Sequence, residues 1–370
     1  MKAIPTPFRK LLAPTFMSLA VVSTAFAATP ETGGRPTTMA PQAMVVTPHY
    51  LASQSALRIL RNGGTALDAA IAAGATLAVV YPQFTAIGGD NVWLVYNAKN
   101  GEVRAMNAIG PASEKATIDF YKSKGMETIP KRGYLSAITV PGAVSGWDQA
   151  YAYSKTQLGS KTKWSAVLED AIRYAEDGFP VSVSHAKWAK NATSGVNKDT
   201  QSLHELPSFK ATFMKPNGGL YEVGEAFRQP ELAKTLKRIS AKGGREFYEG
   251  ETAKLIVADM QAQGGLLTSA DLKSFNAKWE KPLSVEYRGT TAYNAPPPTQ
   301  GMGSLGILNV LNNFDVGSLK EGSAEYVHLL VEATKQSFAD RDRYLTDPDF
   351  NKGMPLEFVL SKQHGKDQAA

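Results

Sequence analysis

Cysteine is absent from the 370 residues, and histidine occurs only five times, at positions 49, 185, 204, 328 and 364. Without cysteine the chain has no disulfide, no thiolate nucleophile, no zinc–cysteine site and no iron–sulfur cluster. No two histidines stand at the spacing of a helical or finger-type metal site. We therefore expect no metal and no cofactor. Catalysis would have to use hydroxyls, carboxylates, amides, arginines or a group outside this chain.

The chain also lacks a strong excess of one charge. It holds 40 Lys and Arg against 34 Asp and Glu, a net charge of +6, and the basic residues are scattered. Such a distribution does not suit nucleic acid as a partner. There is also no Gly-x-Ser-x-Gly segment, so no hydrolase nucleophile is identifiable by its motif. The composition, with 43% hydrophobic residues, is that of an ordinary globular protein.

The N-terminus has the pattern of an export signal. Lys2, Arg9 and Lys10 precede an apolar stretch, and Ala25-Phe-Ala27 places small residues where a signal peptidase reads them. We expect residues 1–27 to be a signal peptide and residues 28–43 to be a flexible N-terminus. The product would be periplasmic or secreted, with membrane contact only through the signal peptide. The alternative is an uncleaved N-terminal anchor.

Residues 62–80 form the most distinctive stretch of the chain. Gly63 and Gly64 are suited to end one helix in the left-handed conformation. Thr65 and Asp68 form a capping pair for the next helix, residues 66–80, which is otherwise apolar on all sides. A membrane span is the alternative, but the run is shorter than the roughly 20 residues that a bilayer requires. We expect a buried helix.

A glycine turn, Ile87-Gly-Gly-Asp-Asn91, follows that helix. Bare backbone N–H groups at Gly88 and Gly89, beside Asp90 and Asn91, could form an anion-binding nest. It is not a phosphate-binding loop, because no Lys-Ser or Lys-Thr follows and a strand is expected where a helix should begin. The alternative is that small residues allow tight packing of helix against strand.

Alternating and helical apolar patterns divide the rest of the chain into short strands and amphipathic helices. Hairpins are expected between residues 92–96 and 103–106, joined by Asn-Gly, and between residues 283–288 and 290–293. The first should pack on the buried helix. Other strands are expected at residues 44–46 and 137–140, and a polar surface excursion at residues 192–219. Other helices are expected at residues 51–61, 164–177, 182–191, 229–242, 251–263, 269–272, 304–312 and 323–344, with one ending at residue 153. With no linker or repeat visible, residues 44–370 read as one α/β or α+β domain.

The last long helix, residues 323–344, raises several site candidates. Its inward residues should be Tyr326, Leu329, Leu330, Ala333, Ser337 and Phe338. His328 is best interpreted as a buried or half-buried histidine. Acidic and basic residues at positions 340–343, 347 and 349 suggest an ion network rather than an acid–base pair. Residues 296–298, three prolines, are either the wall of a binding loop or a stiff connector.

A series of segments in order resembles the γ-glutamyltranspeptidase (glutathione hydrolase) family. The matching segments are residues 62–73, 87–89, 140–147, 171–180, 228–236, 247–250, 264–272, 296–301, 323–330 and 339–350. The resemblance implies an N-terminal-nucleophile hydrolase with an αββα sandwich. It also implies a precursor that cuts itself into a large and a small subunit, whose first threonine is the nucleophile.

By this resemblance the chain is the large-subunit portion, incomplete and inactive without the small subunit as its partner. The resemblance implies an amide hydrolase or acyltransferase acting on a small amide or γ-glutamyl substrate. Gly88, Gly89, Asp90, Asn91 and Ile109 would line or shape the acyl pocket. No catalytic residue is expected in this chain. The alternative is that the chain is not an enzyme subunit but a truncated, inactive remnant that acts as a binding protein.

One departure concerns the substrate. The family's arginine that holds the α-carboxylate of a γ-glutamyl donor corresponds to Ile109, within Asn107-Ala-Ile-Gly110. An aliphatic side chain cannot make a bidentate contact with a carboxylate. The resemblance then points towards family members similar to cephalosporin acylases or to other amidohydrolases.

Overall fold

The computed structural model describes residues 38–193 and 206–370. The chain divides into two units, residues 1–42 and 43–370, and every described helix and strand lies in the second unit. The expected signal peptide, residues 1–27, lies outside the described residues, as do residues 28–37 of the expected flexible N-terminus.

The apolar helix of the sequence is α2 (Ala66–Val80), which follows α1 (Tyr50–Arg61). Thr65 and Asp68 form the expected capping box. Gly63 is left-handed, with φ of +80°. Gly64 is not; it is needed because a Cβ there would lie 2.5 Å from Ile59 Cγ2. Eleven of the 15 residues of α2 are buried, so the prediction of a buried helix is confirmed. Within residues 38–193 and 206–370, no helix is both long enough and apolar enough to cross a membrane.

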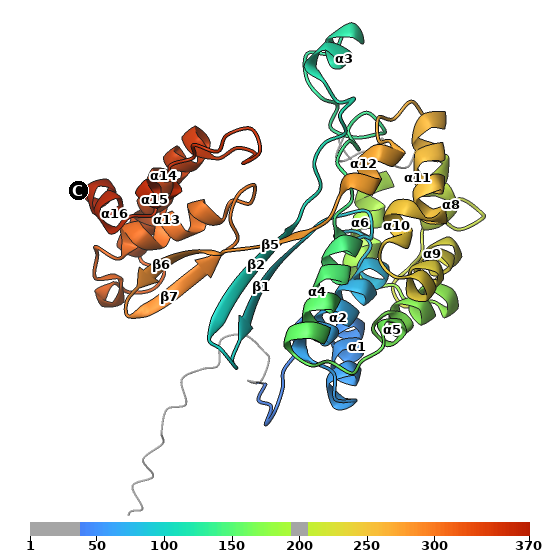
Figure 1. Ribbon diagram of the computed structural model, residues 1–370, viewed down its shortest axis with the longest axis horizontal. Coiled ribbons are helices and arrows are strands. Elements are labelled where there is room, and N and C mark those ends of the chain that lie inside the picture. The colour runs from blue at the N-terminus through green and yellow to red at the C-terminus, as the bar shows by residue number, and fades with distance from the viewer. Residues whose placement is uncertain (1–37, 194–205) are drawn as a thin grey trace, which may run out of the picture. The chain divides into compact units, whose positions relative to one another are not determined.

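Helices α1 and α2 belong to a large helical layer (Figure 1). Its other members are α4 (Ala143–Gln157), α5 (Trp164–Asp177), α9 (Pro230–Lys242), α10 (Glu246–Glu249), α11 (Glu251–Ala262) and α12 (Ser269–Ser274). Their apolar faces share one core that includes Ile71, Val79, Trp147, Leu168 and Leu236. Smaller elements around this layer are α3 (Ile118–Ser123), β3 (Phe179–Pro180), α6 (Val183–Thr193), α8 (Pro207–Phe213) and β4 (Ala226–Phe227).

The main sheet contains β1 (Asn91–Asn97), β2 (Glu102–Ala108) and β5 (Lys278–Glu280), in the order β1-β2-β5. Both pairs are antiparallel, with Trp93 opposite Met106 and Met106 opposite Trp279. Helix α4 contacts both strands of the hairpin and also packs on α2. Layering of helix on sheet is therefore present, but α4 rather than α2 is the helix that covers the hairpin.

The C-terminal part contains a second hairpin and the remaining helices. These are β6 (Leu283–Tyr287), β7 (Thr290–Asn294), α13 (Gly301–Leu311), the 3-10 helix η1 (Val316–Ser318), α14 (Ala324–Tyr344), α15 (Leu356–Val359) and α16 (Lys362–Ala369). The β6–β7 turn has positive φ at both Arg288 and Gly289, as two-residue hairpins prefer. A small apolar cluster of Val310, Leu311 and Ala333 lies between α13 and α14.

Helix α13 begins at Gly301, three residues before the expected position, and a Cβ at Gly301 would lie 2.1 Å from Ala295 O. Further along, α13 packs closely on α14. Ser337 Oγ donates a hydrogen bond to Gly303 O at 2.6 Å. A Cβ at Gly306 would lie 2.4 Å from the same hydroxyl. The absence of a side chain at Gly306 therefore allows the two helices to approach.

Several other expectations were wrong or only partly right. Residues 44–46 are not a strand, and Val46 is exposed; a strand needs a neighbouring strand, which the described part of the chain does not supply there. The strand expected at 137–140 is reduced to a single bridge between Thr139 and Ala112. Helix α4 continues past Tyr153 to Gln157. The expected surface excursion contains α8, while its residues 194–205 lie outside the described residues.

The inward face of α14 was also predicted too broadly. Ala333 and Ser337 are buried, but Phe338 is exposed, and so is His328. Only the side of α14 that faces α13 and α16 is covered among the described residues. The interpretation of His328 as a buried histidine was wrong for the same reason.

Candidate active site

The backbone of the glycine turn lies close to the end of β2 and to the start of α4. The carbonyl oxygen of Gly89 accepts a 2.9 Å hydrogen bond from the N–H of Gly142. A Cβ at Gly142 would lie 1.9 Å from Ala108 O, and one at Gly110 would lie 1.8 Å from Val140 O. Real side chains cannot occupy such positions, so only glycine fits. The glycines of the turn itself have more room: a Cβ at Gly88 would meet nothing within 4 Å, and one at Gly89 would lie 3.4 Å from Ala86 O. Tight packing, the alternative weighed for the glycine turn, therefore requires glycine at Gly110 and Gly142 but not at Gly88 or Gly89.

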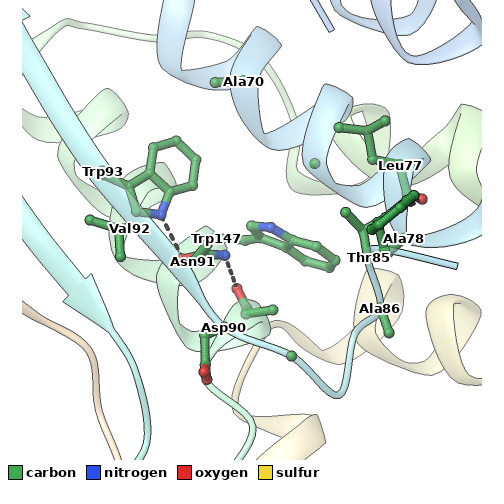
Figure 2. A pocket seen from close by; sticks show the side chains of 14 residues that line it. Ala70, Leu77, Ala78, Thr85, Ala86, Asp90, Asn91, Val92, Trp93 and Trp147 are labelled. Carbon is green, nitrogen blue, oxygen red and sulfur yellow. Dashed lines mark hydrogen bonds between the residues drawn. The ribbon is translucent and has the colours of Figure 1, made fainter. Parts of the chain in front are cut away.

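The side chain of Asn91 links the start of β1 to the start of α4. Its Nδ2 donates to Ala143 O at 2.9 Å, and its Oδ1 accepts from Trp93 Nε1 at 2.7 Å (Figure 2). A Cβ at Gly146 would lie 2.0 Å from that Oδ1. The amide of Asn91 thus joins β1 to the first turn of α4, and both of its ends are engaged within the protein.

Asp90, beside it, carries the titratable group of the turn. Desolvation raises the pKa of its carboxyl, and hydrogen bonds from the backbone N–H groups of Gly142 and Gly110 act in the opposite direction. The net effect is a pKa above the ordinary value. In the turn itself the N–H of Gly89 donates to Ala86 O at 3.2 Å, so one of the two N–H groups considered for an anion-binding nest is already paired within the protein.

A first cavity of about 330 Å³ lies between α2, the loop after it and the start of β1 (Figure 2). Gly89, Asp90 and Asn91 line it, whereas Gly88 is not among the lining residues. The other walls are mainly small or apolar side chains, including Ala70, Leu77, Phe84, Trp93 and Trp147. Three of the five predicted site residues therefore share one cavity.

Ile109 lines a different cavity, of about 270 Å³, at the end of β2. Its walls come from β2, β5, the proline loop and the segment after α14, and they include Asn107, Lys278, Glu280, Pro298 and Asp349. The structure thus separates Ile109 from the glycine-turn residues. The prolines also prove to be a cavity wall, one of the two interpretations left open for them, and the Pro297–Pro298 bond is cis.

Asn107 and Glu280 form the polar centre of this second cavity. Asn107 Nδ2 donates to Glu280 Oε2 at 2.8 Å and lies 3.2 Å from Pro296 O. Asn107 Oδ1 is buried and has no hydrogen-bond partner among the described residues. Burial raises the pKa of Glu280, as does the nearby charge of Asp349, while Asn107 and Lys278 lower it; the net direction is upward.

Sequence reasoning did not select Asn107 or Glu280. Asn107 is in β2, and Ile109 directly follows the last residue of that strand, so period-two alternation continued one residue further could have placed both on one face. Glu280 comes from β5, 173 residues later, and only strand pairing brings it there. Asp347 and Asp349 had been assigned to an ion network, but both line this cavity.

The rest of that assigned network is structural. Asp340 Oδ2 is 2.7 Å from His364 Nε2 and also accepts from Gln368, which ties α14 to α16. Arg341 pairs with its neighbour Asp342 at 2.7 Å. Among residues 38–193 and 206–370, no three His, Asp or Glu side chains are grouped so that they could hold a metal ion.

Comparison with known proteins places this α/β fold among the N-terminal-nucleophile hydrolases. It superposes on γ-glutamyltranspeptidase from Helicobacter pylori with a TM-score of 0.82 at 34% identity, over 90% of this chain and 93% of that one. It superposes on cephalosporin acylase from Bacillus halodurans with a TM-score of 0.78 at 34% identity, over 86% of this chain and 57% of that one.

The family model described as Gamma-glutamyltranspeptidase matches residues 52–370, and the chain belongs to this family. It is 43% identical over 327 residues to the glutathione hydrolase-like YwrD proenzyme of Bacillus subtilis, covering 88% of this chain and 59% of that protein. It is 41% identical over 305 residues to the oxamate amidohydrolase proenzyme of Klebsiella pneumoniae, covering 82% of this chain and 55% of that protein. The chain thus spans less than two thirds of the length of these curated relatives.

Proposed function

We propose that this chain is the large-subunit portion of an exported, self-processing amide hydrolase or acyltransferase. The nucleophile would be the N-terminal threonine of a small subunit that lies outside this chain. Residues 1–370 alone would then be inactive. The family is one of hydrolases and transferases, and its relatives are named as a glutathione hydrolase-like protein and an oxamate amidohydrolase. An inactive remnant is the competing hypothesis.

The observation that carries the proposal is the second cavity. Ile109 stands there at the position where the family resemblance implies an arginine for the donor's α-carboxylate. Beside it, Asn107 and Glu280 present an amide and a carboxyl with a raised pKa. An apolar side chain at 109 favours an acyl donor without a γ-glutamyl α-carboxylate. The proposed substrate is therefore a small amide other than glutathione.

The exposed face of β1 supports the proposed partner. Val92, Leu94 and Tyr96 point to one side of the strand and are 46%, 47% and 65% exposed. Ala105 and Asn107 of β2 lie opposite Leu94 and Val92, on the same face of the sheet. An apolar sheet face of this kind normally packs against a second layer. The strands of a small subunit would supply that layer, next to Asn107.

The first test asks for the small subunit and for processing. We expect an expressed gene that extends beyond codon 370 to yield two chains by mass spectrometry. The first should begin at Ala28 if residues 1–27 are removed on export. That processed pair should hydrolyse an amide, whereas residues 1–370 alone should not. A stop directly after residue 370, with no accompanying small-subunit gene, would support the remnant instead.

The substitution Ile109→Arg tests the substrate assignment in the processed enzyme. A new guanidinium could pair with a donor carboxylate, and a hydrogen bond to a charged group contributes about 1.5–3 kcal/mol. We therefore expect kcat/KM for a γ-glutamyl anilide to rise about 10- to 100-fold. Ile109→Leu is the matched apolar control and should leave it unchanged. If Ile109→Arg processes normally yet gains nothing, the role given to position 109 is wrong.

A further inference from the structure

Helix α16 (Lys362–Ala369) is the last described helix, and its contacts with the rest of the protein are mostly polar. Its eight residues are too few to form a stable helix in water unless neighbouring elements hold them. Ala369 is the only apolar side chain of α16, and it packs on the small apolar cluster between α13 and α14. The position of α16 therefore depends on hydrogen bonds and charges.

Some of these polar contacts do not change with pH near neutrality. Asn309 Nδ2 of α13 donates to Ser361 O, directly before α16, at 2.7 Å. Lys362 pairs with Glu286 of β6 at 2.7 Å, but the two side chains are 76% and 56% exposed, and exposed ion pairs contribute little. An amide does not titrate, and lysine and glutamate ordinarily keep their charge between pH 5 and 8. These contacts hold α16 equally across that range.

The contact between His364 of α16 and Asp340 of α14 is different, because histidine titrates in that range. His364 Nε2 lies 2.7 Å from Asp340 Oδ2, and each of the two side chains is only 14% exposed. Gln368 Nε2 donates to the same carboxylate oxygen at 2.8 Å, and the ring of Phe358 lies 4.4 Å from that of His364. Water screens such a pair less than an exposed one, so the charge of His364 matters more here.

The other charged groups of the elements around His364 do not pair with it. Helix α13 contains no charged residue. Arg343, one turn after Asp340 on α14, and Glu357, beside Phe358 on α15, form no ion pair within residues 38–193 and 206–370. On α16 itself the charged residues are Lys362, which pairs with Glu286, Asp367, which accepts from Gln363 at 2.7 Å, and Lys366. The partner of His364 is therefore a carboxylate, which favours the protonated imidazole.

We propose that His364 and Asp340 form a pH-dependent latch for α16. The protonated imidazole forms an ion pair that fastens α16 to α14, whereas the neutral imidazole leaves only a weaker hydrogen bond. The stabilisation is present on the acid side of the histidine range and is lost as the pH rises through it. Its consequence rests on the proposed function: the chain leading to the small subunit would leave from a fixed α16 at acid pH and from a loosened one at alkaline pH.

Hydrogen exchange of the full chain, residues 1–370, followed by mass spectrometry, tests the latch. After correction for the intrinsic pH dependence of exchange, the protection of residues 362–369 reports how often α16 opens. We expect this protection to be about 3- to 10-fold greater at about pH 5.5 than at about pH 8. His364→Gln keeps a hydrogen-bond donor but cannot be charged, so it should show the alkaline level of protection at both pH values. Asp340→Asn, which removes the other charge, should do the same.

His328→Gln is the matched control, because His328 is an exposed histidine near the start of α14. This variant should keep the pH dependence of the native chain. The latch is overturned if α16 is equally protected at both pH values, or if the pH dependence persists in His364→Gln. Absence of a small subunit would overturn the proposed function but not the latch, because every contact of α16 that forms it lies within residues 1–370.

Discussion

At the scale of the residue, Asp68 shows how one carboxylate can be both a helix cap and a buried anchor. It is fully buried and accepts hydrogen bonds from Thr65 N at 3.0 Å, Ser154 Oγ at 2.8 Å and Ser160 Oγ at 2.6 Å. Burial raises the pKa of Asp68, but the hydrogen bonds from Ser160, Thr65 and Ser154 outweigh it, and the pKa is lowered overall. The charged form is therefore the one that the fold stabilises.

Replacement of Asp68 by Asn should destabilise the protein in a pH-dependent way. A carboxyl with a lowered folded pKa contributes stability above its unfolded pKa, and that stability is lost as pH falls through the folded pKa. We expect Asp68→Asn to cost about 1–3 kcal/mol at neutral pH and progressively less as the pH falls below about 4. Urea unfolding at several pH values measures this.

Asp119→Asn is the matched control for that experiment. Asp119 is exposed in the first turn of α3, so its replacement should change stability little at any pH. If Asp68→Asn gave the same cost at neutral and acid pH, the hydrogen bonds to Asp68 would not depend on its charge, contrary to the geometry.

At the scale of the element, close approaches of backbone decide which helix covers the sheet. Helix α4 lies against β1 and β2 because Gly142 and Gly146 have no side chains. Gly146 leaves room for the Asn91 amide, which then bonds to Ala143 in the first turn of α4. The composition of α4 is otherwise that of an ordinary half-buried helix, and its glycines set its position.

Gly146→Ala should therefore separate α4 from β1. The new methyl would lie 2.0 Å from Asn91 Oδ1, and overpacking of this kind costs about 1–3 kcal/mol or more. Gly303→Ala, the same change in α13, meets no atom closer than 3.8 Å and should stabilise by up to about 1 kcal/mol through helix propensity. Thermal unfolding of both variants provides the comparison. Equal effects at the two glycines would contradict the close approach seen at α4.

At the scale of the whole molecule, β1 is an edge strand with one apolar face uncovered. Val92, Leu94 and Tyr96 form this face, and β1 pairs only with β2 among the described strands. Helix α14 likewise exposes Val327, Val331 and Phe338. Uncovered edges and apolar faces promote association of chains. Residues 1–370 expressed alone should self-associate, and the processed pair should not.

Leu94→Thr tests the origin of that behaviour. Threonine retains strand propensity while removing apolar surface, so the isolated chain should sediment as smaller species in analytical ultracentrifugation. The same change should weaken assembly with the proposed small subunit by about 1 kcal/mol. Val223→Thr, which alters an exposed valine outside the strands, is the control. No change in the sedimentation of Leu94→Thr would mean that another surface drives association.

Local sequence alone determined α1, α2, both hairpins and the cap formed by Thr65 and Asp68, because hydrogen bonds and periodicity within a few neighbouring residues specify them. The family and its fold class also followed from ordered motifs, and the similarity to known proteins confirms both. Helix α13 was misjudged at its start because Gly301 is explained only by its close approach to Ala295 O, and Gly306 only by contact with Ser337 of α14. The strand at residues 44–46 failed because a strand requires a partner that local pattern does not reveal.

The predicted site residues also show which features the sequence determines and which depend on the tertiary structure. The sequence singled out Gly88, Gly89, Asp90, Asn91 and Ile109 together, but tertiary structure put Gly89, Asp90 and Asn91 in one cavity and Ile109 in another. It also joined Asn107 to Glu280 across 173 residues, which no short-range pattern predicts. Helix caps and turns depend on neighbours along the chain, whereas cavities and raised pKa values depend on which distant side chains exclude water. The sequence therefore predicted the caps and turns, whereas only the tertiary structure decided the cavities and the raised pKa values.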